Sequence, residues 1–212
     1  VYASSDSCTL AISGATTLNS GSADITLNEA ASTFGTLAIT GTNVAVTENA
    51  AMDLGASTIS GTASFNSSNN AITDSGTLAI TGVTTLNSGS ADLTLDEAAS
   101  TFGALAITGA NVAVTENAAV DLGSSMVSGT LGITSSGAVT SSGTSTITGA
   151  VTISAPGQAV TLTNADSIFG DFSVNAKDVY IKESGLFTST NITAETVQVS
   201  ATDGVSVIST GD

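Results

Sequence analysis

Short runs of alternating apolar and polar residues, most of them closed by glycine, follow one another along almost the whole chain. In TLAITG, NVAVTE and NAAVDLG, a Leu, Ile or Val alternates with a smaller or more polar residue. A period of two with many β-branched residues is typical of short β-strands, and Gly, Asn and Asp between the runs supply the corners. We therefore predict an all-β fold made of short strands.

Three such runs together make one repeating unit, as in 91–109, 110–129 and 130–149. This spacing predicts a parallel β-solenoid of triangular cross-section, with three short strands per turn and roughly ten turns. Successive turns should rise by about one inter-strand spacing, near 4.8 Å. The phrase VTTLNSGS (83–90) does not fit this spacing, so we expect a longer turn or a bulge there.

Residues 9–62 and 77–130 are two copies of one sequence at an offset of 68, identical at 44 of 54 aligned positions. A third, decayed copy aligns at an offset of 67 when Phe102 is matched with Phe169; Glu116 then matches Glu183. Stacked architectures favour such repeats because each unit buries its apolar surface against its neighbours. We predict one solenoid domain, residues 1–212, with copies at 9–76, 77–143 and about 144–212.

Apolar positions survive in the third copy while the residues between them change, which marks these positions as the core. The windows NEAASTFG and DEAASTFG are too short for a stable helix, although each could form a single turn. Their phenylalanines should fill an interior that otherwise holds small side chains. The predicted core residues are Phe34, Phe102, Phe169, Leu105, Ile107, Val112 and Val114.

The composition of the chain argues against several classes of binding partner. Acidic residues number 18 against two lysines, with no Arg or His and a net charge of −16, which makes nucleic acid or an anionic membrane an implausible partner. No apolar stretch approaches the length of a membrane span, and Cys8 has no partner for an intramolecular disulfide. A mean hydropathy of +0.38 argues against disorder.

The phrases TLAITGANVAVTENAAVDLG and ADLTLDEAASTFG resemble the β-strand repeats of large bacterial exoproteins. These are the filamentous-haemagglutinin-like adhesins and related autotransporter passengers. The resemblance covers essentially residues 9–187. It implies a right-handed parallel β-helix, secretion to an extracellular or cell-surface location, and a role in adhesion, matrix or filament formation.

The sequence offers few residues that could act as catalytic groups. A polysaccharide lyase needs a base and a cation, and only Lys177 and Lys182 are available. At their spacing on one strand, they should face opposite sides. Glycoside hydrolysis needs two carboxylates.

Glu116 with Asp121 is one nominal pair of carboxylates and Asp96 with Glu97 another. The first pair recurs at an offset of 68, as Glu48 and Asp53, whereas a single active site would not be duplicated. We expect these carboxylates to lie on a solvated face, and we predict no enzyme.

Calcium is the cofactor that the sequence leaves open. Asp92, Asp96 and Glu97 could align on one edge of stacked turns and present oxygen ligands to a hard cation. Otherwise no cofactor is expected. For the recurring asparagines Asn43 and Asn111 we favour a structural role, as stacked amide ladders or caps of corner backbone groups.

The predicted function is a structural rod or filament building block, because neither end of the chain has the polar cap that a solenoid end needs. Exposed terminal turns could then stack on another subunit, or the sequence could be part of a longer chain. An adhesin stalk that contacts glycans or matrix is the main alternative. An ice-binding solenoid and a polysaccharide-active β-helix enzyme also remain open, whereas Tyr2 and Tyr180 are too few for a carbohydrate-stacking platform.

Overall fold

The computed structural model describes residues 4–207, all of them in strands, turns or loops and none in a helix. In chain order the strands are β1 (Ser4–Ser5), β2 (Ala11–Ile12), β3 (Thr16–Asn19), β4 (Ile25–Leu27), β5 (Thr33–Phe34), β6 (Thr36–Gly41), β7 (Val44–Thr47), β8 (Met52–Leu54), β9 (Ser57–Ile59), β10 (Ala63–Asn66), β11 (Ile72–Asp74), β12 (Leu78–Asn87), β13 (Leu93–Leu95), β14 (Thr101–Gly109), β15 (Val112–Glu116), β16 (Val120–Leu122), β17 (Ser125–Val127), β18 (Leu131–Ser135), β19 (Val139–Ser141), β20 (Ser145–Ile147), β21 (Val151–Leu162), β22 (Phe172–Glu183), β23 (Phe187–Thr193), β24 (Thr196–Ala201) and β25 (Val205–Val207).

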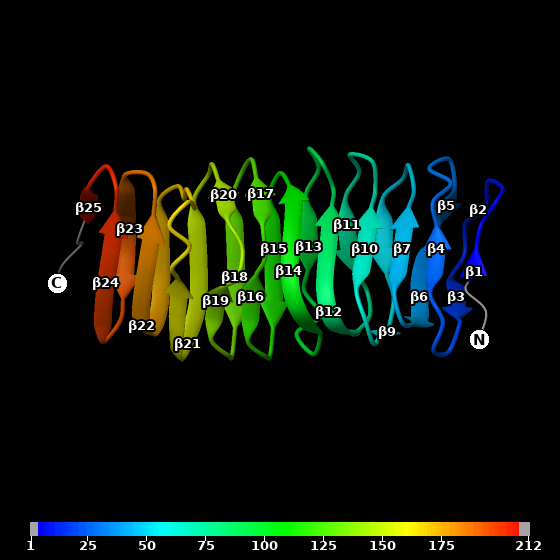
Figure 1. Ribbon diagram of the computed structural model, residues 1–212, viewed down its shortest axis with the longest axis horizontal. Coiled ribbons are helices and arrows are strands. Elements are labelled where there is room, and N and C mark those ends of the chain that lie inside the picture. Colours follow the sequence, from blue (N-terminus) through cyan, green and yellow to red (C-terminus); the bar gives the residue numbers. More distant parts are fainter. Residues whose placement is uncertain (1–3, 208–212) are drawn as a thin grey trace.

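The strands stack along one axis, from β1 at one end to β24 and β25 at the other (Figure 1). Every pairing in the described chain is parallel, and 23 strands belong to one continuous sheet. One column of strands runs through Ile25, Val44, Ala63 and Thr84, which pair in succession. Each step along this column is therefore one turn, and the chain forms a β-solenoid of about ten turns, as the alternating pattern predicts.

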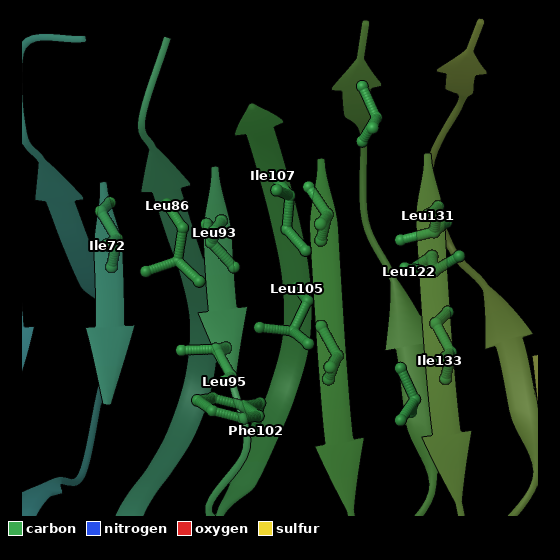
Figure 2. Close-up of a cluster of buried hydrophobic side chains, with 14 of the residues drawn as sticks. Ile72, Leu86, Leu93, Leu95, Phe102, Leu105, Ile107, Leu122, Leu131 and Ile133 are labelled. Atoms are coloured by element: carbon green, nitrogen blue, oxygen red, sulfur yellow. The ribbon is translucent and has the colours of Figure 1, made fainter. Parts of the chain in front are cut away.

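The interior is filled by every second side chain of the strands between β4 and β22. Figure 2 shows Leu95, Phe102 and Leu105 pointing into the same narrow space from neighbouring strands. The structure buries all seven residues that the sequence assigns to the core, with at most 9% of any of them exposed. Burying these side chains contributes roughly 1.5–3 kcal/mol each, so the apolar alternation is the main source of stability.

A bulge lies just before the irregular phrase at 83–90 and not within it, because residues 83–87 pair in regular register with residues 104–108. The register of β12 on β14 shifts between Ile80 and Val83. After the strand, Asn87 accepts a hydrogen bond at its Oδ1 from the N–H of Gly89 (3.0 Å), and Gly89 has a positive φ of 59°. This bulge divides β12 into two segments, 78–80 and 83–87, that lie in different columns.

The repeat seen in the sequence is not a whole number of turns. Starting from Ile25, three turns lead to Thr84, yet the residue equivalent to Ile25 in the second copy is Leu93, on the next strand. Leu93 pairs with Ile72 and Val112, in a different column. Each copy therefore spans three turns and one further strand, and successive copies begin one face apart.

Candidate functional site

Ending one column of strands leaves backbone groups without a partner. Strand β5 pairs with β2 on one side, and among the described strands none pairs with its other side. The chain one turn later, after Thr47, is a loop instead of a strand. A buried N–H without an acceptor costs about 1–3 kcal/mol, so the column can end only where a side chain replaces the missing carbonyl.

Glu48 supplies that acceptor. Its Oε2 accepts a hydrogen bond from the N–H of Phe34 (2.9 Å), and no part of the glutamate is exposed to solvent. The alternation of β7 directs the side chain inward, because Val44, Val46 and Glu48 share one face. The glutamate thus stands at a core position and closes the end of a sheet column.

The same contact recurs in the other two copies. Glu116 accepts from the N–H of Phe102 (3.2 Å) and Glu183 from that of Phe169 (3.0 Å), at the same separation along the chain as in the first copy. Both carboxyl groups are buried, with 1% and 2% exposure. Three column ends along the rod are therefore closed in the same way, including the one in the decayed copy.

Burial also sets the protonation of these groups. It raises the pKa of Glu48 and of Glu116 from 4.5 to about 7, and the hydrogen bond from the phenylalanine N–H offsets only part of this effect. Burial raises the pKa of Glu183 in the same way. In each glutamate the second carboxyl oxygen has no hydrogen-bond partner among the described residues. The folded chain therefore favours the neutral acid.

Near the point where one column of strands ends, one strand of another column pairs with two strands of the next turn. Strand β6 pairs with β8 through Leu37 and with β9 through Thr40, so two strands stack on one. In the gap between them Ser57 accepts at its Oγ from the N–H of Ile39 (2.9 Å) and donates to Gly55 O (2.8 Å). The number of columns per turn thus stays at three while their positions shift by one face.

The second copy divides its column with the equivalent serine. Ser125 accepts from the N–H of Ile107 (3.1 Å) and donates to Gly123 O (3.1 Å). A second serine position, occupied by Ser32, Ser100 and Ser167, accepts a backbone N–H from the preceding turn in all three copies. These buried polar residues are the elements of the repeat that its apolar pattern does not reveal.

The expectation that the paired carboxylates lie on a solvated face is wrong for the two glutamates and correct for the two aspartates. Glu116 does not lie on a solvated face but inside the core, whereas Asp121 faces outward between buried Val120 and Leu122. In the first copy, likewise, Glu48 is buried and Asp53 faces outward. Asp53 accepts a hydrogen bond from the Thr36 hydroxyl (2.7 Å). Neither pair flanks a common space in which a glycosidic bond could be cleaved.

The three calcium candidates have separate surroundings. Asp92 and Asp96 are exposed and Glu97 is half-buried. The Oδ1 of Asp92 accepts from the backbone and the side chain of Asn111, and the backbone N–H of Asp96 donates to Asp74 (2.8 Å). In residues 4–207 no three His, Cys, Asp or Glu side chains are placed to hold a metal ion.

Asp74 is a buried carboxylate that no sequence pattern singles out. Burial raises its pKa from 3.8 to about 6; the backbone N–H groups of Asp96 and Glu97 lower it, and the charges of those two residues raise it. One of its oxygens has no hydrogen-bond partner in the described part of the chain.

The asparagines form the expected corner ladders. Asn43 donates its backbone N–H and its Nδ2 to Asp24 (both 3.0 Å), and its Oδ1 accepts from the N–H and the hydroxyl of Thr62 (both 3.1 Å). The second copy repeats the ladder with Asp92, Asn111 and Thr130. The amides therefore join three successive turns at a solvent-exposed corner, which confirms their structural role.

Both lysines point outward from β22, contrary to the expectation of opposite faces. The inward positions change parity between Ala176 and Val179, where the strand passes from one face of the solenoid to the next. Lys177 and Lys182 are exposed on either side of this change.

Residues 4–40, 41–108 and 109–175 match a family described as repeats of unknown function (DUF5649). The chain belongs to this family. The second and third DUF5649 segments are as long as the two offsets seen in the sequence. No curated protein and no solved structure is significantly similar to the chain. Among residues 4–207 there is no helix long and apolar enough to cross a membrane.

Proposed function

We propose that this chain is a non-enzymatic, extracellular structural protein, a rod or filament building block at a bacterial surface. The observation that carries the proposal is the single ladder of parallel strands that runs through all turns of the solenoid. Force along the rod is then distributed over many backbone hydrogen bonds. The repeated buried glutamates support this view, because each serves the fold by accepting a backbone N–H where a column of strands ends.

An external location agrees with the surface chemistry. The net charge of −16 keeps rods apart laterally and in solution, and the chain offers trypsin-like proteases only two lysines and no arginine. An adhesin stalk, as in the filamentous-haemagglutinin-like proteins, uses the same architecture and is the second candidate. A surface groove lined by Tyr180 and Lys182 gives that candidate a specific place for a ligand.

We propose further that rods join end to end by stacking turn on turn. On the last described turn Val197, Val205 and Val207 are 49%, 51% and 54% exposed, although their positions alternate as core positions do. In the described chain β24 and β25 pair only with earlier strands, so each has an open edge. Open edges with apolar side chains normally pair with another chain.

Sedimentation velocity over a range of concentrations tests this proposal. The wild-type chain should assemble further as its concentration rises. Val205→Lys should reduce assembly at least tenfold, because a charge in the junction is costly to bury. Val83→Lys changes an exposed valine away from the ends and serves as the matched control. A wild-type chain that stays monomeric at all concentrations, or equal effects of the two substitutions, would reject end-to-end stacking.

A further inference from the structure

The third copy retains the core of the repeat but changes its outer surface at one place on β22. Tyr180 stands where the earlier copies have Ala113 and Ala45, and Lys182 stands where both have threonine. The inward neighbours, Val179 and Ile181 among them, remain apolar and buried. Two small outward residues have thus been replaced by an aromatic ring and a cation, with no change that the fold requires.

These two side chains line a groove that crosses three stacked strands, β21, β22 and β24. Tyr180 pairs in register with Thr161 on one side and Gln198 on the other, and Lys182 pairs with Ser200. The groove has a volume of about 250 Å³. Its lining residues are Thr161, Thr163, Tyr180, Ile181, Lys182, Gln198 and Ser200.

The equivalent place in the first copy provides an internal comparison. There a groove of about 170 Å³ surrounds Ala45, with no aromatic ring and no cation among its lining residues. It contains Asp24 and Asn43 instead, whose polar atoms are bonded to each other in the corner ladder. Of these two equivalent grooves, the one in the third copy is the larger, and it is the one lined by an aromatic ring and a cation.

The chemistry of this groove is unusual for the molecule. All six phenylalanines are buried, so Tyr180 is the aromatic side chain in the described chain that reaches the surface. One ring is too few for an extended stacking platform, but a single half-buried ring can stack on the apolar face of one sugar unit. The hydroxyl and amide groups beside it can bond to sugar hydroxyls. The ammonium of Lys182 adds an attraction for a carboxylate.

We propose that this groove binds a saccharide unit that carries one carboxylate. Lys182 is the charged residue among those that line the groove, whereas Asp178, two positions before Tyr180 on the same outward face, is not one of the lining residues. The sugar carboxylate then lies at Lys182, with the ring over Tyr180. Long polyanions are poor ligands because the whole molecule, at −16, repels them.

Isothermal titration of the full chain with glucuronate, and with glucose as its neutral counterpart, tests the proposal. Glucuronate should bind at least tenfold more tightly than glucose, since one ionic hydrogen bond contributes about 1.5–3 kcal/mol. Lys182→Met should remove this preference, and Tyr180→Ala should weaken the binding of both sugars. Lys177→Met removes the other lysine, away from the groove, and should change neither affinity.

Saturable binding of glucuronate that Lys177→Met and Lys182→Met weaken equally would overturn the site, as would the absence of saturable binding. Equal affinity for the two sugars would overturn the role of the carboxylate. The test is independent of filament formation, because Lys182→Met and Tyr180→Ala leave Val197, Val205 and Val207 in place. Loss of sugar binding with normal assembly would therefore reject only this proposal.

Discussion

The raised pKa of Glu116 predicts that the solenoid is more stable in mild acid than in mild base. Its pKa is about 7 in the folded chain against 4.5 for an ordinary glutamate, because burial disfavours the charged carboxylate. A group whose pKa is raised by folding contributes its full stabilisation below the unfolded value and loses it as the pH rises through the folded value. Stability should therefore fall between about pH 4.5 and pH 7 and stay low above that range.

The size of the effect follows from the shift. A change from 4.5 to about 7 corresponds to a free energy of unfolding lower by on the order of 3 kcal/mol per carboxyl at high pH. Glu48 has the same pKa, so it should contribute a similar amount. Glu116→Gln imitates the neutral acid and keeps an oxygen that accepts from the N–H of Phe102. It should match the wild type at pH 4.5 and exceed its stability at pH 8.

Urea unfolding followed by far-UV circular dichroism, at a series of pH values, measures this difference. Asp121→Asn is the matched control, because it removes one carboxylate from the same copy at an outward position. Glu116→Ala removes the acceptor and should destabilise the chain by about 1–3 kcal/mol even in acid. The reasoning is refuted if Glu116→Gln and the wild type keep a constant difference across this pH range, or if Gln is the less stable at pH 8.

Three further predictions, one of them with a matched control substitution, concern the interior and the corners and are tested by thermal unfolding. Phe172→Ala should cost about 3–5 kcal/mol, since the ring is fully buried against two other phenylalanines; a loss below about 1 kcal/mol would contradict this packing. Gly82→Ala should lower the free energy of unfolding by about 1–3 kcal/mol, because the added Cβ would lie 2.5 Å from a backbone oxygen. Gly132→Ala is the control and should be neutral, because the nearest atom to its Cβ is 3.8 Å away. Equal effects of the two substitutions would refute the close stacking of the corner at Gly82. Asn111→Asp places a second carboxylate against Asp92 and should destabilise the corner by about 1 kcal/mol at pH 7 but not at pH 3; a loss that persists in acid would contradict charge repulsion as its cause.

The architecture could be predicted from the sequence because its cause is local. Alternation at residues such as Leu105 and Ile107 directs every second side chain inward, and three successive alternating runs give the length of a turn. The glutamates could not be assigned in the same way. Glu116 follows Val112 and Val114 in one alternating run, which places it inside, but its charge favours the surface. Only the partner N–H of Phe102, on an earlier strand, resolves this conflict.

The number of turns in each copy of the repeat could not be predicted from single strands either. Whether one copy makes three turns or three turns and a strand depends on which strands pair, and in particular on Leu93 pairing with Val112. The persistence of glutamate in the decayed copy, at Glu183, was the available indication that this position serves the fold. A polar residue that survives at a core position, while outer residues change, indicates a buried hydrogen bond.

Electron microscopy of the concentrated chain tests the central claim most directly, that this solenoid is a structural unit whose turns continue from one copy to the next. We predict unbranched filaments of one solenoid width, with strands about 4.8 Å apart along the axis and no interruption at the junctions. Single rods at every concentration, or rods that associate only side by side with their terminal turns open, would contradict it.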